Sequence, residues 1–265
     1  MPQPIIFDQS LSTRFVQARQ VFLRKLLPDI KEGLSLRTAA DVGCGVGYFS
    51  RFLREMGFRV VAFDGREANI EEAKRRNPEI EFHVADVEDP ALQKLGSFDL
   101  VLCFGLLYHL ENPLQTLRNL CPLTDKLLLI ESACIPGEVP ILYLRDEVEF
   151  GDQGIRCLVS YPSEGCLIKM GYRAGFPFVY RFTSLPVHED FQVTLGRKRA
   201  RTMLAASKVP LSFPFLALAE EPVNPPPSWP TARIGVPPIL GRLEYFLRRP
   251  WPEKLATLRR RFGLG

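Results

Sequence analysis

A glycine-rich turn directly after a short apolar run is the feature that most constrains how this chain folds. Residues 43–47 read Gly-Cys-Gly-Val-Gly, so every second residue lacks a side chain. Such a backbone bends sharply and lies close against a ligand. The residues that follow have apolar side chains at helical spacing, which predicts a helix whose free N–H groups and positive dipole end point toward the turn. This unit of strand, turn and helix predicts a site for a nucleotide-like ligand.

Strand and helix patterns alternate along the chain and define its fold class. Helical patterns begin at Ser12 or Thr13, with Pro28 and Gly33 as stops, and continue at 48–56, 67–76, 113 to about 120 and 163–171. Strand patterns cover residues 38–42, 59–64, 80–85, 98–104, 126–132, 178–182 and 191–195. Strands that alternate with helices predict an α/β fold with an open, mostly parallel sheet. The last two strands have no helix between them, so we expect a seven-stranded, Rossmann-like sheet with helices on both faces and one antiparallel strand.

Charge and proline content divide the chain into parts. The net charge of the 265 residues is +4, but residues 197–265 hold 13 basic and 4 acidic residues, a net charge of +9. The same segment holds 11 of the 23 prolines, which indicates a boundary near Gly196. We therefore expect an N-terminal helical cap (1–36), a core (37–196) with a substrate-side insertion (133–162), and a basic, proline-rich C-terminal extension (197–265).

Composition also excludes several classes of protein. No apolar stretch is long enough to span a bilayer, and the N-terminal residues do not resemble a secretory signal. The six cysteines form no C-x-x-C pair, so we expect no metal site and a reduced, cytoplasmic setting. No sequence pattern indicates an oligomeric state.

Carboxylates follow two further strands of the expected sheet. Asp64 ends the second strand, where its carboxylate oxygens are placed to accept hydrogen bonds from two ribose hydroxyls. Asp86 ends the third strand, where a carboxylate is suited to the exocyclic amine of adenine. Open α/β sheets bind ligands at these carboxyl ends. A dinucleotide motif would place its third glycine one residue later, at the position of Tyr48.

In these motifs the chain resembles the class I S-adenosylmethionine-dependent methyltransferases, over about residues 39–196. The resemblance rests on the glycine turn with Asp41 before it, on Asp64, on Asp86, and on two runs, Phe-Asp-Leu-Val at 98–101 and Tyr-His-Leu-Glu-Asn-Pro at 108–113. It implies S-adenosylmethionine as the cofactor and S-adenosylhomocysteine as the product. The cofactor-binding residues that it implies are Asp41, Gly43, Cys44, Gly45, Gly47, Asp64, Gly65, Asp86, Val87, Phe104 and Gly105.

Within that set, the resemblance assigns a part of the cofactor to each group of residues. The three glycines of the turn hold the methionine part, and Asp41 helps to bind its ammonium group directly or through water. Asp64 holds the ribose, and Asp86 with Val87 holds the adenine. The net acidic charge of residues 1–196 suits a cofactor that carries a sulfonium and an ammonium cation.

Candidate catalytic residues follow the fourth strand. Methyl transfer mainly needs the nucleophile, methyl carbon and sulfur to be aligned, with a general base only where the acceptor keeps its proton. His109 lies in a carboxyl-end loop near the expected methyl group and is a candidate base, and Tyr108 is a candidate for the pocket wall. The alternatives are that His109 orients the loop or caps the helix beginning near Pro113, and that Tyr108 only packs.

The acceptor is expected to be a small polar molecule with a hydroxyl group, such as a saccharide or a lipid-linked compound. Two alternatives stay open: modification of tRNA or another RNA, and a non-catalytic cofactor-binding interaction subunit. The extension contains a basic amphipathic pattern around residues 252–262, which either docks on the enzyme or contacts an anionic membrane surface or nucleic acid. The insertion supplies polar side chains for an acceptor, namely Arg145, Asp146, Glu147, Gln153, Arg156 and Tyr161.

Overall fold

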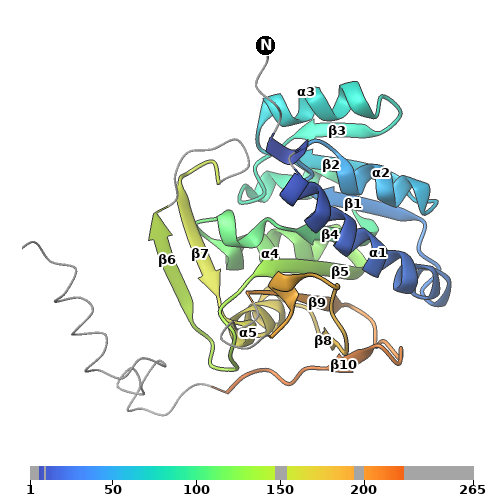
Figure 1. The fold of residues 1–265 in the computed structure, drawn as a ribbon. Helices are drawn as coiled ribbons and strands as arrows, with labels where there is room; N and C mark the ends of the chain where they lie inside the picture. Colours follow the sequence, from blue (N-terminus) through green and yellow to red (C-terminus); the bar gives the residue numbers. More distant parts are fainter. Residues whose placement is uncertain (1–5, 9, 147–153, 194–199, 224–265) are drawn as a thin grey trace, which may run out of the picture. The chain divides into compact units, whose positions relative to one another are not determined.

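The computed structural model describes residues 6–8, 10–146, 154–193 and 200–223 (Figure 1). Residues 1–223 form one compact unit, and every described residue belongs to it. The predicted amphipathic pattern at 252–262, and the residues Glu147 and Gln153 of the predicted polar set, lie outside the described residues.

An eight-stranded sheet forms the centre of the molecule. In spatial order its strands are β10 (Leu216–Leu218), β8 (Phe178–Phe182), β9 (Arg201–Ser207), β5 (Thr124–Ala133), β4 (Phe98–Phe104), β1 (Thr38–Val42), β2 (Arg59–Asp64) and β3 (Glu81–Val84). Strands β1 to β5 are parallel, β9 is antiparallel to both of its neighbours, and β10 is antiparallel to β8. The predicted mostly parallel α/β sheet is confirmed, with eight strands in place of seven.

The end of the sheet differs from the sequence prediction. A strand was expected at 191–195, but Phe191 ends the short 3-10 helix η4 (Glu189–Phe191), and the antiparallel strand is β9 at 201–207. Strand β9 is buried from Thr202 to Ser207, and it fits between β5 and β8 because its central residues are small or apolar. The boundary near Gly196 is therefore wrong as the end of the core, because two strands of the sheet follow it.

Helices cover both faces of the sheet. Helix α1 (Ser10–Gly33), α2 (Tyr48–Glu55) and α3 (Glu67–Arg76) pack on one face, whereas α4 (Pro113–Leu123) and α5 (Glu164–Ala174) pack on the other. Helix α1 continues through Pro28, although this proline was predicted to end it. Leu27 and Ile30 are almost fully buried on either side of this proline, so packing on the sheet outweighs the lost backbone hydrogen bond.

The insertion at 133–162 contains a hairpin of its own. Strands β6 (Leu142–Asp146) and β7 (Leu158–Pro162) form a separate antiparallel pair (Figure 1). Three short 3-10 helices complete the fold: η1 (Ile6–Asp8), η2 (Pro90–Leu95) and η3 (Leu107–His109). Among the described residues, no helix combines the length and the apolar character that crossing a membrane requires.

Candidate functional site

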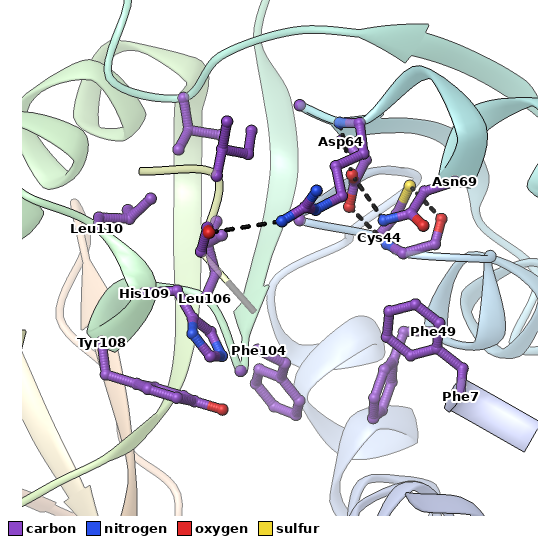
Figure 2. Close-up of a pocket in the computed structure, with 18 of the residues that line it drawn as sticks. Phe7, Cys44, Phe49, Asp64, Asn69, Phe104, Leu106, Tyr108, His109 and Leu110 are labelled. Carbon is purple, nitrogen blue, oxygen red and sulfur yellow. Dashed lines mark hydrogen bonds between the residues drawn. The ribbon is translucent and has the colours of Figure 1, made fainter. Parts of the chain in front are cut away.

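A cleft of about 470 Å³ opens at the carboxyl ends of the parallel strands. Its wall combines the glycine turn, the ends of β2 and β4, helix η3, the N-terminal segment and residues next to the hairpin. Figure 2 shows Asp64 and Asn69 on one side of this space, with Phe104, Tyr108 and His109 on the other. Of the residues predicted to bind the cofactor, those that line the cleft are Gly43, Cys44, Gly45, Asp64, Gly65, Asp86, Val87, Phe104 and Gly105.

The glycine turn has the backbone conformation that its composition predicts. Gly43 and Gly45 have φ angles of +73° and +53°, in the left-handed region that side chains disfavour. A Cβ atom on Gly43 would lie 2.9 Å from a methyl carbon of Leu106, and one on Gly45 would lie 3.3 Å from the ring of Phe7. The bare backbone therefore allows both neighbours to close around this end of the cleft.

Asp64 is held in place by donors from the turn and from α3. Its Oδ2 accepts a hydrogen bond from Gly45 N at 2.9 Å, and its Oδ1 accepts from Arg66 N at 2.9 Å and Asn69 Nδ2 at 3.0 Å. A carboxylate offers about four acceptor positions, so about one is left for a ligand. Asp64 therefore has room for one ribose hydroxyl rather than two.

Two predicted cofactor residues do not line the cleft. Asp41 is buried in β1, where the Ser50 hydroxyl donates to its Oδ2 at 2.6 Å, and burial raises the pKa of its carboxyl group to about 7. Gly47 turns away toward α3, since a Cβ atom there would lie 2.9 Å from Asn77 Nδ2 and 3.2 Å from the ring of Phe82. Asp41 and Gly47 therefore lie behind the turn and do not form part of the cleft wall.

The predicted adenine end is covered by residues that precede β7. Asp86 accepts from Glu88 N at 2.9 Å and from Arg156 Nη2 at 2.8 Å, and Arg156 also pairs with the Glu88 carboxylate. The adjacent Ile155 approaches the turn after β2, because a Cβ atom on Gly65 would lie 2.5 Å from its Cδ1. The insertion thus reaches the end of the cleft at which Asp64 and Asp86 lie.

Tyr108 and His109 lie together on η3 and both line the cleft. Their ring centroids are 4.0 Å apart, and the ring of Tyr161 stacks on Tyr108 at 6.0 Å. The cap of α4 is the Asn112 side chain, which accepts from Gln115 N at 3.2 Å. The alternative that His109 caps this helix is therefore wrong, and its position in the cleft wall leaves the base role as a prediction.

A charged cluster of Arg19, Glu131 and Arg201 was not recognised from the sequence. Glu131 accepts from Arg201 Nε at 2.6 Å and from Arg19 Nη1 at 2.7 Å, and its side chain has no solvent exposure. Both arginines line the cleft. The one sequence signal was a glutamate directly after the four apolar residues 127–130 of the strand, while Arg201 was assigned to the basic extension. Arg201 is instead part of the sheet, as the first residue of β9.

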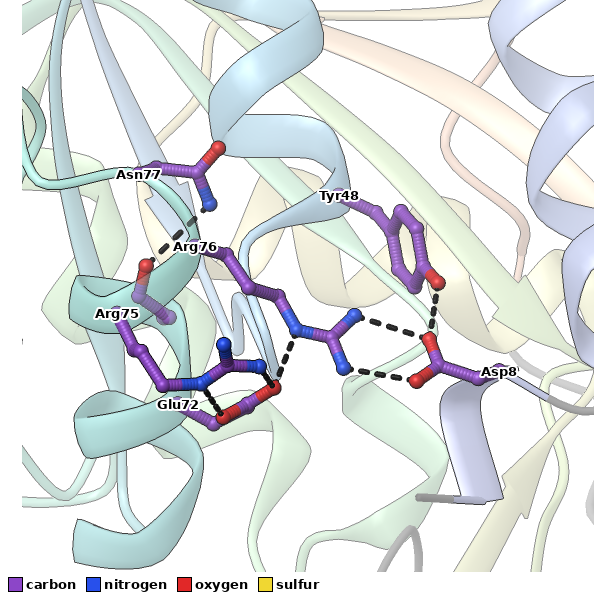
Figure 3. A network of polar contacts seen from close by, with 7 residues as sticks. Asp8, Tyr48, Glu72, Arg75, Arg76 and Asn77 are labelled. Carbon is purple, nitrogen blue, oxygen red and sulfur yellow. Dashed lines mark hydrogen bonds and ion pairs between the residues drawn. The ribbon is translucent and has the colours of Figure 1, made fainter. Parts of the chain in front are cut away.

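The N-terminal helix η1 is tied down by a second polar network (Figure 3). Arg76 donates to both carboxylate oxygens of Asp8, at 2.9 Å and 2.8 Å, and the Tyr48 hydroxyl donates to the same carboxylate. Hydrogen bonds from Arg76 and Tyr48 lower the pKa of Asp8 to about 2. Arg76 also donates to Glu72 at 2.6 Å, which anchors the network on α3. This network holds Phe7 over Gly45.

The described part of the chain contains no group of three or more His, Cys, Asp or Glu side chains arranged to hold a metal ion. Cys44 lines the cleft, but burial raises the pKa of its thiol well above the usual value, so it is not a thiolate at neutral pH.

Comparison with known proteins identifies one domain within the chain. Residues 40–124 match the methyltransferase domain family. The chain therefore contains a methyltransferase domain over these residues. Magnesium protoporphyrin IX methyltransferase from Synechocystis PCC 6803, solved with bound S-adenosylmethionine, shares the fold at 20% identity over 79% of this chain and 86% of its own, with a TM-score of 0.51. The N-terminal domain of EvdMO1, solved in the presence of S-adenosylhomocysteine and D-fucose, covers 72% of this chain and 83% of its own at 20% identity, with a TM-score of 0.58.

Two curated relatives are similar to this chain in sequence. The tRNA U34 carboxymethyltransferase of Desulfotalea psychrophila is 30% identical over 184 residues, which are 64% of this chain and 53% of the relative. The ubiquinone biosynthesis O-methyltransferase of Xanthomonas campestris pv. campestris is 35% identical over 82 residues, which are 29% of this chain and 34% of the relative. The chain therefore spans about half of the first relative and a third of the second.

Proposed function

We propose that this chain transfers a methyl group from S-adenosylmethionine to a small polar acceptor that bears a hydroxyl group. The observation that supports the proposal most is the order of groups along one edge of the sheet. Asp86, Asp64, the glycine turn and Gly105 follow β3, β2, β1 and β4, which are neighbours in that order. This order matches adenine, ribose, methionine and the transferred methyl group of one extended cofactor.

The residues present fit this cofactor. Asp64 keeps about one unused acceptor position for a ribose hydroxyl, and the bare backbone of Gly43 and Gly45 leaves room at the methionine end. When bound, S-adenosylmethionine supplies a methyl group that its sulfonium already activates. The rings of Phe49 and Phe104 lie 5.3 Å apart and give the cleft wall an apolar part beside the expected methyl group.

In this proposal the remaining task of the protein is to place the acceptor and to remove its proton. His109 lies in the cleft wall beyond Gly105 and takes the proton from the acceptor hydroxyl. Tyr108 and Tyr161 form the adjoining wall and orient the acceptor. A methyltransferase domain of this kind favours an enzyme over a non-catalytic cofactor-binding subunit.

Calorimetric titration with S-adenosylmethionine and S-adenosylhomocysteine tests the cofactor part of the proposal. We expect binding of both, and no binding to either would refute it.

Incubation with methyl-labelled cofactor and a small-molecule extract, followed by mass analysis of the product, tests the acceptor. His109→Ala is expected to lower turnover by 10²-fold or more with unchanged cofactor affinity, whereas retained turnover would exclude the base role.

A second candidate function is the modification of RNA. It is supported by the similarity to the tRNA U34 carboxymethyltransferase and by the net charge of +9 in residues 197–265. Nuclease treatment of a whole-cell extract separates the two candidates. Labelling that survives the nuclease supports the small acceptor, and labelling that disappears supports RNA.

A further inference from the structure

The cluster of Arg19, Glu131 and Arg201 carries an excess positive charge inside the cleft. The side chains of Arg19 and Arg201 are only 8% and 12% exposed, and Glu131 lies between them with no exposure. Burial raises the pKa of Glu131, but the charges of Arg201 and Arg19 outweigh this effect and hold its pKa below the usual value. Because guanidinium groups stay protonated in proteins, the three side chains together carry one net positive charge.

The hydrogen-bonding capacity of the two arginines is not used up within the cluster. Glu131 accepts hydrogen bonds from Nη1 of Arg19 and Nε of Arg201, and Arg201 Nη2 donates to the same carboxylate at 3.4 Å. Arg201 Nη1 also lies 3.4 Å from the Tyr108 hydroxyl. The Nε atom of Arg19 is buried and has no hydrogen-bond partner among the described residues. Two guanidinium groups supply ten N–H donors, more than one carboxylate accepts.

The cluster lies on the acceptor side of the predicted cofactor. The glycine turn follows β1, and the sheet then continues through β4, β5 and β9. Glu131 is on β5, paired with Phe104 of β4, and Arg201 is on β9, opposite Ala133. The cluster is therefore one to two strands beyond Gly105, whereas Asp64 and Asp86 lie in the opposite direction.

The net positive charge of the cluster favours a ligand that places a negative group beside Arg19 and Arg201. A cationic sulfonium and a cluster with net charge +1 in one cleft repel each other unless an anion lies between or beside them. Two aromatic rings contact the Arg201 guanidinium. Its Cζ lies 4.7 Å from the ring centroid of Phe15 and 4.8 Å from that of Tyr108. Rings that stack on guanidinium planes fix their orientation and leave the edges for a planar anion.

We propose that Arg19 and Arg201 bind an anionic group of the acceptor, a carboxylate or a phosphate, and so restrict the acceptor to acidic hydroxyl compounds. The inference rests on the proposed function, because it gives the class of acceptor for the same cleft. Glu131 acts as a positioning residue that holds the two guanidinium groups side by side. A purely structural role, in which Arg19 only fastens α1 to the sheet, leaves the second arginine and the unpaired Nε unexplained.

The test uses the full chain saturated with S-adenosylhomocysteine and three probes of equal size class: benzoate, phenyl phosphate and the neutral benzamide. Calorimetric titration is expected to show at least tenfold tighter binding of one of the two anions than of benzamide. Tighter binding of benzoate assigns a carboxylate acceptor, and tighter binding of phenyl phosphate assigns a phosphate. Equal affinity for benzamide, or no anion binding at all, overturns the inference.

Variants locate the anion on the cluster. Arg201→Met is expected to bind the anion no more tightly than benzamide. The affinity of this variant for S-adenosylhomocysteine is expected to stay within about threefold of that of the unmodified chain. Arg201→Lys keeps the charge but lacks the planar fork, so we expect an intermediate anion affinity, and this variant serves should Arg201→Met fail to fold. Arg181→Met is the matched control. Arg181, on β8, donates from Nε to Oε1 of the buried Glu164 on α5 at 2.8 Å, and it does not line the cleft.

Failure of this inference is distinguishable from failure of the proposed function. An equal loss of anion and S-adenosylhomocysteine affinity in Arg201→Met would mean that the cluster holds the carboxylate of the cofactor, which overturns the inference and leaves methyl transfer intact. Absence of S-adenosylhomocysteine binding in the unmodified chain would instead defeat the proposed function, and the inference with it.

Discussion

Asp41 is a buried carboxyl group that accepts a hydrogen bond from the Ser50 hydroxyl, and its burial makes the stability of the fold sensitive to pH. Burial raises its pKa from 3.8 to about 7, so the folded chain keeps a proton that the unfolded chain releases near pH 4. The contribution of Asp41 to the free energy of unfolding therefore falls as the pH rises from about 4 to 7. We predict that Asp41→Asn gains stability relative to the unmodified chain over this range, by on the order of 2 kcal/mol.

Denaturant unfolding at pH 5 and pH 8 measures this difference. Asp29→Asn, at an exposed position of α1, is the control and is expected to show no such trend. A stability difference between Asp41→Asn and the unmodified chain that is the same at both pH values would contradict the prediction.

Gly43 combines a strained backbone with a close neighbour. Its φ angle of +73° disfavours a side chain, and a Cβ atom would lie 2.9 Å from Leu106. We predict that Gly43→Ala loses about 1–2 kcal/mol of stability from the backbone alone, and more than tenfold in affinity for S-adenosylhomocysteine because the turn must shift. Calorimetry and thermal unfolding measure the two effects.

Gly96 provides the matched control for this substitution. Its φ angle is +97°, but a Cβ atom there would meet nothing within 4 Å, and it does not line the cleft. Gly96→Ala is expected to lower stability to a similar extent while the affinity for S-adenosylhomocysteine stays unchanged. A similar loss of affinity in both variants would show that strain, rather than the shape of the turn, is responsible.

At the scale of elements, η1 is a short helix that lies at one end of the cleft. Asp8 is the charged residue that attaches it to the rest of the fold. Asp8 bonds to Arg76 on α3 and to Tyr48 on α2, and it thereby holds Phe7 over Gly45. We predict that Asp8→Asn lowers the affinity for S-adenosylhomocysteine by about three- to tenfold at pH 7, since one charged hydrogen-bond acceptor is lost. Calorimetry of this variant beside Glu55→Gln, which alters an exposed pair with Arg24 remote from the cleft, measures the effect.

The sign of the pH dependence follows from the lowered pKa of Asp8. Since the folded value is about 2 and the usual value is 3.8, the stabilising contact is complete above about pH 4 and is lost as the pH falls toward 2. The affinity difference between Asp8→Asn and the unmodified chain should therefore be constant from pH 5 to pH 8. A difference that grew or vanished within this range would assign the effect to another group.

The same scale shows which elements the sequence predicts and which it does not. Helix α3 has the predicted bounds because its apolar face, acidic start and Asn-Pro stop all agree. Strand β9 was missed because a basic run precedes it, so composition assigned it to the extension, although its burial between β5 and β8 decides its structure. Local patterns predict an element where they agree with tertiary packing, and they fail where packing alone decides.

The candidate site divides in the same way. The glycine turn and Asp64 are separated by few residues and follow strands that are neighbours in the sheet, so their meeting could be predicted from order alone. The cluster of Arg19, Glu131 and Arg201 joins residues that are 112 and 70 positions apart, from α1, β5 and β9. No spacing in the sequence indicates such a contact, because it depends on how α1 lies over the sheet and on the position of β9.

At the scale of the whole molecule, the described residues that line the cleft all belong to the unit of residues 1–223. The last strand ends at Leu218, and the residues after it still pack on α5, where Tyr172 donates to Ala219 O at 2.5 Å and Lys169 donates to Pro222 O at 3.2 Å. Among the described residues, those that line the cleft all precede residue 202. Folding and cofactor binding are therefore expected to need nothing beyond Val223.

Residues 224–265 differ in charge from the rest of the chain. They contain 8 basic and 2 acidic residues, a net charge of +6, so residues 1–223 have a net charge of −2. A contact of the C-terminal part with RNA or an anionic membrane would then be strongly dependent on salt. Truncation after Val223 separates this property from the chemistry of the cleft.

We predict that the chain truncated after Val223 keeps its unfolding temperature within a few degrees and its affinity for S-adenosylhomocysteine within twofold. If the acceptor is a small molecule, methyl transfer into a nuclease-treated extract also survives the truncation, because the acceptor meets only the cleft. The measurements are thermal unfolding, calorimetry and labelled transfer, each at 50 and 200 mM salt, a range over which RNA contacts weaken steeply. Loss of transfer with unchanged affinity for S-adenosylhomocysteine would contradict the small-acceptor proposal, because it would place acceptor recognition in the basic segment.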